Sequence, residues 1–444
     1  MSQILKRAEK IVVPSERSQK QKDAIVEQVI KLVQKQVTDY PQITGIEVVG
    51  SYAKGTWLPQ KADIDIFIKF QTSVPEKEFA ELGKRIGFAA LRNFKPYVRY
   101  AEHPFVEAQI DDTKVNLVPC YDVQEGNWKS SADRSPFHTR FMINSLSPQM
   151  KNEVRLLKAF LKANDIYGAE IAKQGFSGYV AEVLVLNFGS FEGVLKAVSE
   201  LKQGQVIGKA AKDFDTPIAI MDPIDPNRNL GAAISTENVG KLVLAARAYL
   251  KKPSISFFKS KKRPQSGSKG HLKNILVLTF RYRQRSPDII WGQLKRAAAS
   301  IATQIEQEGF SVLRRSAVIS KKDTASLLFL LQSVKLDSHH VRKGPDFFTA
   351  EHVEKFVESN RKKSNTMWIN EEGKIHSLQK RSQADAVSLL KELLKNNLEK
   401  SGVPAGLKDD MKKFKISLGS KVTSKSIKEA ALELVSTDET IFSS

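Results

Sequence analysis

Residues 46–70 read IEVVGSYAKGTWLPQKADIDIFIKF, and this stretch decides the fold. An apolar strand runs into Gly50 and Ser51, a short polar segment follows, and a second apolar strand carries Asp63 and Asp65. Successive side chains of a strand point to opposite faces. The two aspartates therefore share one face of the second strand, and the isoleucines between and beside them occupy the other.

This order of residues predicts a site for metal ions and phosphate. Two carboxylates held side by side repel each other unless a cation joins them, and hard oxygen ligands of this kind suit Mg²⁺. The turn at Gly50 and Ser51 can offer backbone N–H groups and a hydroxyl to phosphate. A lone D-x-D pair or a lone Gly-Ser turn is usually only structural. Their succession between two apolar strands favours a metal-dependent nucleotidyl-transfer site.

The composition indicates a globular protein that binds polyanions. Hydrophobic residues make up 41% of the chain and aromatic residues 8%, which is enough for ordinary cores. Its 444 residues allow roughly two to four domains. The net charge of +21, from 70 Lys and Arg against 49 Asp and Glu, makes nucleic acid the leading partner. A basic protein without such a partner is the alternative.

The sequence also predicts a cellular location. Cys120 is the single cysteine, which excludes an intrachain disulfide and an all-cysteine zinc site and fits a reducing compartment. The first residues lack the apolar segment of a signal peptide, and no apolar run reaches the roughly 18 residues of a membrane span. We therefore expect a cytoplasmic protein with no membrane contact.

Hydrophobic periodicity predicts the order of helices and strands. Helices are expected over 15–38 (with Ser15 as the N-cap), 75–92, much of 150–200, 236–251, 291–309 and 384–399. Strands are expected near 97–101, 104–110 and 113–119, from 217 onward before a Pro- and Asn-rich loop that ends near 232, and over 274–282, 311–317 and 325–333.

These elements indicate an α/β (α+β) multidomain chain with three parts. Residues 1–149 read as a small α/β domain with a mixed sheet, and residues 150–258 as a helical domain. The segment 259–273 is basic, rich in Ser, Gly and Pro and free of acids, which is typical of a linker at a domain boundary. The β-α-β-β order that follows predicts a ferredoxin-like or RNA-recognition-like sheet within 259–444.

Nine stretches spread along the chain carry a more specific resemblance. They are GSYAKGTWL at 50–58, AEHPFVE at 101–107, VPCY at 118–121, DRSPFH at 133–138, EVRLLK at 153–158, DIYGAE at 165–170, GFSGY at 175–179, DPIDPNRN at 222–229 and RKGP at 342–345. In these stretches the chain resembles archaeal-type (class I) CCA-adding enzymes. These are tRNA nucleotidyltransferases of the DNA polymerase β nucleotidyltransferase superfamily.

The resemblance implies an architecture and an activity. The architecture is a polymerase-β-like nucleotidyltransferase head, a helical central domain and a tRNA-binding C-terminal body with a helical tail. The activity is template-independent addition of C, C and A to the 3′ end of tRNA from CTP and ATP, with Mg²⁺ as cofactor and release of pyrophosphate. A homodimer is compatible with the resemblance, but the sequence alone fixes no oligomeric state.

The resemblance also implies roles for individual residues. Asp63 and Asp65 would bind the catalytic Mg²⁺ ions. The nucleotide would contact Gly50, Ser51, Lys54, Ser135, His138, Lys158, Tyr167 and Arg228, and Arg228 would read the base together with the tRNA backbone. The family commonly has Arg where this chain has Lys54, and often Thr where it has Ser135. Each residue also has an ordinary alternative: a solvated cation, a packed tyrosine or a satisfied histidine.

Asn116 is the main departure from the family. The family has a third catalytic aspartate at this position, where it neutralises a metal ion and can accept the proton of the attacking 3′-hydroxyl. An amide is neutral and a poor base. Asp111 and Asp112 are poor substitutes, because they lie roughly 13–16 Å away along a strand.

Asn116 leaves several interpretations open. The chain could be a silenced copy that traps substrate, a natural tRNA-binding relative without full activity, or an enzyme with an unusual third ligand. We favour an enzyme with strongly reduced turnover. A poly(A) polymerase or another member of the superfamily would share the G-S and D-x-D core, but would lack the tRNA-type C-terminal half and would not use CTP.

Overall fold

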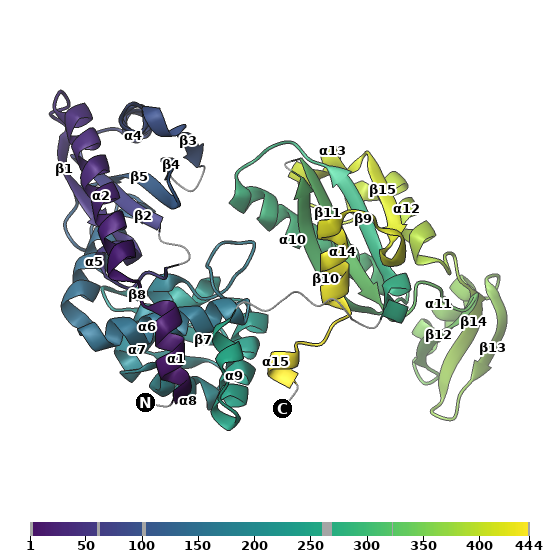
Figure 1. Ribbon diagram of the computed structural model, residues 1–444. Coiled ribbons are helices and arrows are strands. Elements are labelled where there is room, and N and C mark those ends of the chain that lie inside the picture. Colours follow the sequence, from purple (N-terminus) through teal and green to yellow (C-terminus); the bar gives the residue numbers. More distant parts are fainter. Residues whose placement is uncertain (1–2, 60–62, 100–103, 260–268, 322, 443–444) are drawn as a thin grey trace. The chain divides into compact units, whose positions relative to one another are not determined.

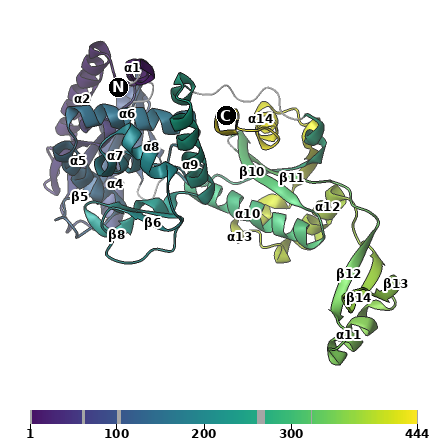
Figure 2. The same cartoon turned by 90° about the horizontal axis from the view of Figure 1, so that it is seen from below.

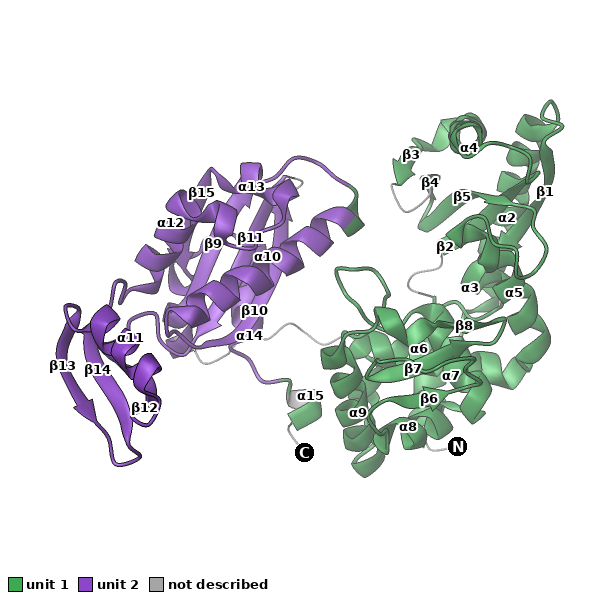
Figure 3. Ribbon diagram, turned by 180° about the vertical axis from the view of Figure 1, so that it is seen from behind, with its two compact units in different colours: residues 1–261, 286–288, 438–444 green, residues 262–285, 289–437 purple. Residues whose placement is uncertain are grey.

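The structure is a computed structural model, and it describes residues 3–59, 63–99, 104–259, 269–321 and 323–442 (Figure 1). The chain forms two compact units (Figure 3). Unit 1 contains residues 1–261, 286–288 and 438–444, and unit 2 contains 262–285 and 289–437. Most of the predicted basic linker, and the first three residues of the stretch 101–107, lie outside the described residues. The division into three domains stays a prediction.

Unit 1 begins with the expected mixed sheet. Its strand order is β1-β2-β5-β4-β3, and only β2 and β5 run parallel to each other. Helices α2 and α4 cover one face, where they pack on the alternating apolar residues of the strands. Ser15 caps α2 as predicted. The elements are β1 Ile43–Val49, β2 Asp63–Phe70, β3 Tyr97–Arg99, β4 Phe105–Ile110, β5 Thr113–Tyr121, α2 Glu16–Val37 and α4 Glu76–Ala90.

The rest of unit 1 consists of packed helices and a small sheet, and Figure 2 shows these helices from below. A serine at the N-cap starts each of α6, α7, α8 and α9, and its hydroxyl accepts a backbone N–H of the first turn. The elements are α1 Gln3–Val12, α5 Arg134–Ser145, α6 Pro148–Ala163, α7 Gly178–Phe188, α8 Phe191–Ser199, α9 Thr236–Lys251, α15 Glu439–Phe442, β6 Gln205–Ile207, β7 Ile218–Asp222 and β8 Asp225–Asn229.

One prediction for this region is wrong. The Pro- and Asn-rich segment after β7 was expected to be a loop, but residues 225–229 form β8, which pairs with β7. The hairpin is irregular where it turns, and Asn229 holds it by accepting the backbone N–H of Ile220. Proline is tolerated here because it lies on a short edge strand.

Unit 2 contains the expected ferredoxin-like sheet. Along the chain the four strands are β9, β10, β11 and β15, and they lie antiparallel in the sheet order β10-β11-β9-β15. The last strand, β15, therefore lies beside the first, β9, and β11 lies between β9 and β10. Helices α10 and α12 pack on one face, and α14 packs on the other. The elements are β9 Ile275–Arg281, α10 Pro287–Gln307, β10 Val312–Lys321, β11 Thr324–Leu331, α12 Ala386–Asn396, α13 Ala405–Met411, β15 Phe414–Leu418 and α14 Lys425–Leu434.

An insertion between β11 and α12 adds a second sheet to unit 2. Its strand order is β12-β14-β13, and α11 connects the first two strands along the chain. The elements are β12 His339–Asp346, α11 Ala350–Asn360, β13 Ser364–Ile369 and β14 Lys374–Lys380. Among the described helices, no single one is long and apolar enough to cross a membrane; α7 and α8 together meet the length and composition criteria but are bent by 89°.

Candidate functional site

A row of polar side chains crosses the face of the first sheet opposite α2 and α4. Strand register pairs Asp65 of β2 with Asn116 of β5, and Asn116 with Glu107 of β4. Asp63 lies two residues before Asp65 on the same face and is exposed. The alternation predicted from the sequence is confirmed, because Ile64 between the two aspartates is fully buried in the apolar core.

Asp65 and Asn116 interact directly. The Nδ2 group of Asn116 donates a hydrogen bond to Oδ1 of Asp65 at 2.8 Å. Burial raises the pKa of the Asp65 carboxyl; the Asn116 hydrogen bond opposes that effect, and the charge of Asp63 adds to it. The Oδ1 atom of Asn116 is buried and accepts no hydrogen bond from the described residues. A buried oxygen without a hydrogen-bond donor, on a residue that stands between Asp65 and Glu107 in the strand register, suits a cation.

These residues fit one Mg²⁺ ion better than two. Asp63 and Asp65 supply two anionic oxygen ligands, and Asn116 Oδ1 supplies a neutral one. Within the described residues, no group of three or more His, Cys, Asp or Glu side chains lies close enough to hold a metal ion. The site therefore has the donor set of a divalent cation but lacks the third carboxylate expected of a two-metal centre.

Gly50 allows the turn after β1 to approach the carboxylates. It has a φ of +78°, and a Cβ atom at this position would lie 2.3 Å from Oδ2 of Asp65. Residues Gly50–Ala53 form one helical turn, α3. The N–H of Gly50 donates to Thr139 Oγ1, and Thr139 donates in turn to the carbonyl of Ser135. Thr139 thus brings the start of α5 beside the turn.

Lys54 and Lys158 meet at a buried carboxylate. Glu182 of α7 is 0% exposed and pairs with both lysines, and Thr56 also donates to it. The Lys158 ammonium lies 2.9 Å from Glu182 Oε1 and donates to Thr56 Oγ1 at 3.0 Å. Both lysines are buried, so the alternative of solvated surface cations is wrong for them.

The pKa values of this cluster reflect burial and shared charge. Burial by itself would raise the pKa of the Glu182 carboxyl, but the ammonium groups of Lys158 and Lys54 outweigh it and hold that pKa at about 2. Burial lowers the pKa of the Lys158 ammonium to about 8, against the attraction of Glu182. Glu182 and Lys158 are therefore ionised at pH 7. Two ammonium groups against one carboxylate leave one positive charge in excess.

Tyr167 lies near the Lys158 ammonium. Gly178 opens α7, and a Cβ atom on it would lie 2.8 Å from the Tyr167 hydroxyl and 3.4 Å from the Lys158 ammonium. The two side chains therefore come together over this glycine. Tyr167 is half-buried, and the negative charge of Asp63 is among those that raise its pKa, after burial and Glu182.

A second carboxylate joins His138 and Arg228. Asp222, at the end of β7, lies 2.9 Å from His138 Nε2 and 3.1 Å from Arg228. Tyr179 donates to the same carboxylate at 3.1 Å, and its ring stacks on His138 at 3.9 Å. Burial lowers the pKa of His138, against the pull of Asp222. The Lys54 ammonium lies over the Tyr179 ring, which links the two clusters.

The structure thus groups the predicted residues around three anchors that sequence reasoning missed: Thr139, Glu182 and Asp222. Glu182 had a signal, since it is a single acid in the apolar run 180–185. Asp222 stood in a recognised stretch but received no role. Thr139 had no signal, because its contacts join segments far apart in the chain.

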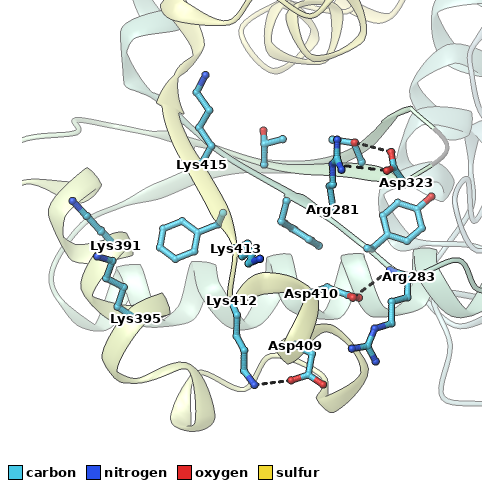
Figure 4. A pocket seen from close by; sticks show the side chains of 15 residues that line it. Arg281, Arg283, Asp323, Lys391, Lys395, Asp409, Asp410, Lys412, Lys413 and Lys415 are labelled. Carbon is cyan, nitrogen blue, oxygen red and sulfur yellow. Dashed lines mark hydrogen bonds and ion pairs between the residues drawn. The ribbon is translucent and has the colours of Figure 1, made fainter.

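Unit 2 carries a separate basic pocket of about 1190 Å³ (Figure 4). Its cations come from β9, α12 and the segment before and within β15, and its aromatic walls include Phe280, Tyr282 and Phe414. Lys412 is paired with Asp409. No ion pair within the described residues joins four further lysines of the lining: Lys391, Lys395, Lys413 and Lys415. These exposed cations are available to phosphate.

Three family models match successive parts of the chain. They describe a nucleotidyltransferase domain over residues 26–140, the second domain of tRNA nucleotidyltransferases over 152–259, and the C-terminal domain of CCA-adding enzymes over 272–419. Together they follow the polypeptide from α2 to the end of β15.

Curated relatives match over most of their length. A CCA-adding enzyme of Pyrobaculum aerophilum is 36% identical over 379 residues, which is 84% of this chain and 86% of that protein. A CCA-adding enzyme of Saccharolobus islandicus is 34% identical over 386 residues, 86% and 90% of the two chains. The solved structure of E. coli MS115-1 CdnC with ATP gives a TM-score of 0.43 at 19% identity, over 57% of this chain and 94% of that one.

Proposed function

The chain belongs to the family of archaeal CCA-adding enzymes, the class I tRNA nucleotidyltransferases, and from this premise we propose that it adds C, C and A to the 3′ end of tRNA from CTP and ATP. The observation that carries the proposal is the close approach of the Gly50 turn to Asp65, with Asp63 two residues away on the same face of β2. Paired carboxylates would hold a metal there, and backbone N–H groups would receive the triphosphate. Pyrophosphate is the second product.

The metal-binding residues in this proposal are Asp63, Asp65 and the Oδ1 atom of Asn116. Bound Mg²⁺ would neutralise the triphosphate and make the 3′-hydroxyl of tRNA a better nucleophile. Asp63 and Asp65 have the charge that this binding requires. Asn116 cannot accept a proton as a carboxylate would, so we propose that turnover is strongly reduced relative to family members with aspartate there.

The nucleotide in this proposal lies between the two anchored clusters. The excess positive charge of Lys54 and Lys158 over Glu182 favours the triphosphate, and Gly50, Ser51 and Tyr167 border the same space. Ser135 is linked to the Gly50 turn through Thr139, which donates a hydrogen bond to the Ser135 carbonyl. His138 and Arg228, both fixed by Asp222, are assigned to the base, and Arg228 is exposed enough to reach tRNA phosphate as well.

The basic pocket of unit 2 is assigned to the tRNA backbone. Unpaired lysines neutralise phosphates without reading sequence, which suits an enzyme that must accept every tRNA. The flanking Phe280, Tyr282 and Phe414 form the apolar part of the pocket lining. The cytoplasmic location and the homodimer remain predictions from the sequence.

A single assay tests the proposed activity. The protein is incubated with a tRNA transcript that lacks CCA, with labelled CTP and ATP, and with Mg²⁺, and the products are resolved at nucleotide resolution. Addition of C, C and A supports the proposal. Tails of A alone would point instead to a poly(A) polymerase, and binding without extension to a silent tRNA-binding relative, the alternative that Asn116 favours.

A further inference from the structure

Glu107 is a buried carboxylate on the metal-facing side of the first sheet. It stands opposite Asn116 in the antiparallel pair of β4 and β5, and Asn116 stands beside Asp65 in the parallel pair of β2 and β5. The three side chains therefore form one row across three neighbouring strands and project from the same face. Glu107 is only 4% exposed.

Glu107 has one hydrogen-bond donor and two cations as partners. The Tyr97 hydroxyl donates to its carboxylate, and the Arg99 and Lys114 cations lie 3.5 Å from it. The side chains of Arg99 and Lys114 are 48% and 45% exposed, so much of their charge is screened by water.

Asn116 provides an independent sign of a cation at this row. Its Oδ1 atom is buried and has no hydrogen-bond partner among the described residues, whereas its Nδ2 group is committed to Asp65. Buried acceptors are rarely left without a partner. A hydrogen-bond acceptor between two carboxylates would be satisfied by a positive ion.

We propose that Glu107 supplies the third negative charge of the metal site, one strand beyond the position where the family has its third aspartate. The inference rests on the proposed metal-dependent function. Glu107 does not touch the reacting atoms; it strengthens the attraction between the site and a divalent cation while Asp63 and Asp65 provide the anionic ligands. The neutral amide of Asn116 is then tolerated at the metal site, because Glu107 on the neighbouring strand β4 carries the negative charge that the amide lacks.

Titration with Mn²⁺ tests this on the full chain, with free Mn²⁺ followed by electron paramagnetic resonance and neither nucleotide nor tRNA present. Five proteins are compared: the parent, Glu107→Gln, Asn116→Asp, the double variant, and Glu125→Gln as an exposed control. Glu107→Gln is expected to weaken Mn²⁺ binding about tenfold, which is about 1.4 kcal/mol. The double variant restores three negative charges and is expected to return to within about threefold of the parent.

Rescue by Asn116→Asp decides the matter. If Glu107 supplied something other than negative charge, the double variant would bind Mn²⁺ as weakly as Glu107→Gln, and that failure of rescue would overturn the proposal. Unchanged Mn²⁺ affinity in Glu107→Gln would do the same. Because no tRNA and no turnover enter the measurement, a failure of CCA addition leaves this result intact, and the two proposals fail separately.

A second variant keeps the test valid if Glu107→Gln does not fold. Arg99→Met removes a half-exposed cation that lies 3.5 Å from Glu107, on the edge strand β3 and away from Asp63. The proposal expects its Mn²⁺ affinity to rise about threefold, since the negative charge that faces the metal is then less screened. An affinity equal to or below that of the parent would contradict the proposal.

Discussion

Asn116 donates a hydrogen bond to Asp65 across the parallel pair of β2 and β5, with 2.8 Å between Nδ2 and Oδ1. The Asn116 amide thereby satisfies one oxygen of the Asp65 carboxylate. The same carboxylate would repel a second carboxylate in the place of the amide. A carboxylate at position 116 would lose this bond and add repulsion unless a cation were present. The site as it stands is therefore easier to keep folded without metal, and weaker as a metal site.

The first prediction follows from this pair. Asn116→Asp is expected to raise turnover of CTP and ATP by about tenfold or more, which corresponds to about 1.4 kcal/mol of barrier. Without Mg²⁺ the same variant is expected to unfold more readily than the parent, and Mg²⁺ should remove that difference. Single-turnover extension of tRNA and thermal unfolding with and without Mg²⁺ measure the two effects. A smaller gain in turnover would show that Asn116 does not limit the reaction.

The second prediction concerns Glu182. Glu182→Gln leaves two buried ammonium groups without a carboxylate, so it is expected to lower the free energy of unfolding by about 3 kcal/mol. Glu192→Gln, on the exposed face of α8, is the matched control and is expected to change little. Chemical denaturation at pH 7 compares the three proteins.

A pH dependence follows from the same carboxylate. Its pKa is about 2 in the fold against 4.5 as the reference value, so between these values the unfolded chain binds the proton and the folded chain does not. The stability that Glu182 contributes is thus present above pH 4.5 and is lost as the pH falls toward 2. Glu182→Gln should show a shallower loss of stability across this window. Identical slopes in the two proteins would contradict the assignment.

The third prediction tests Asp222 as the anchor of the base-contact residues. Asp222→Asn weakens its bonds to His138 and Arg228 together, so KM for CTP and for ATP is expected to rise about tenfold, with a smaller change in kcat. Asp213→Asn, at an exposed position before β7, serves as the control. Initial rates over a range of each nucleotide give both constants. An effect confined to kcat would place Asp222 in the chemical step instead.

The fourth prediction tests the basic pocket of unit 2. Lys413→Ala and Lys415→Ala together are expected to weaken binding of a CCA-less tRNA about tenfold and to reduce the salt slope by about 1 for each lysine. Lys428→Ala, exposed on α14 over the other face of the sheet, is the control. Fluorescence anisotropy at several salt concentrations measures both quantities. An unchanged slope would mean that these lysines do not contact phosphate.

Local patterns in the sequence were sufficient for most elements. Ser15 before an apolar repeat predicted the start of α2, and alternation predicted that Asp63 and Asp65 share a face. These inferences depend on residues that are neighbours along the chain. The strand β8 was missed because its proline and asparagines favour a loop, and only pairing with β7 makes it a strand.

The candidate site likewise combines features that the sequence predicts with features that only the tertiary structure shows. The sequence by itself determined the paired aspartates, the glycine turn and the neutral amide at Asn116. Only the tertiary structure decided that Asn116 bonds to Asp65, that Glu182 holds Lys54 and Lys158, and that Glu107 stands in the same row. The physical reason is that strand register and helix packing join residues from 9 to 128 positions apart, and the energy of a buried charge depends on those neighbours.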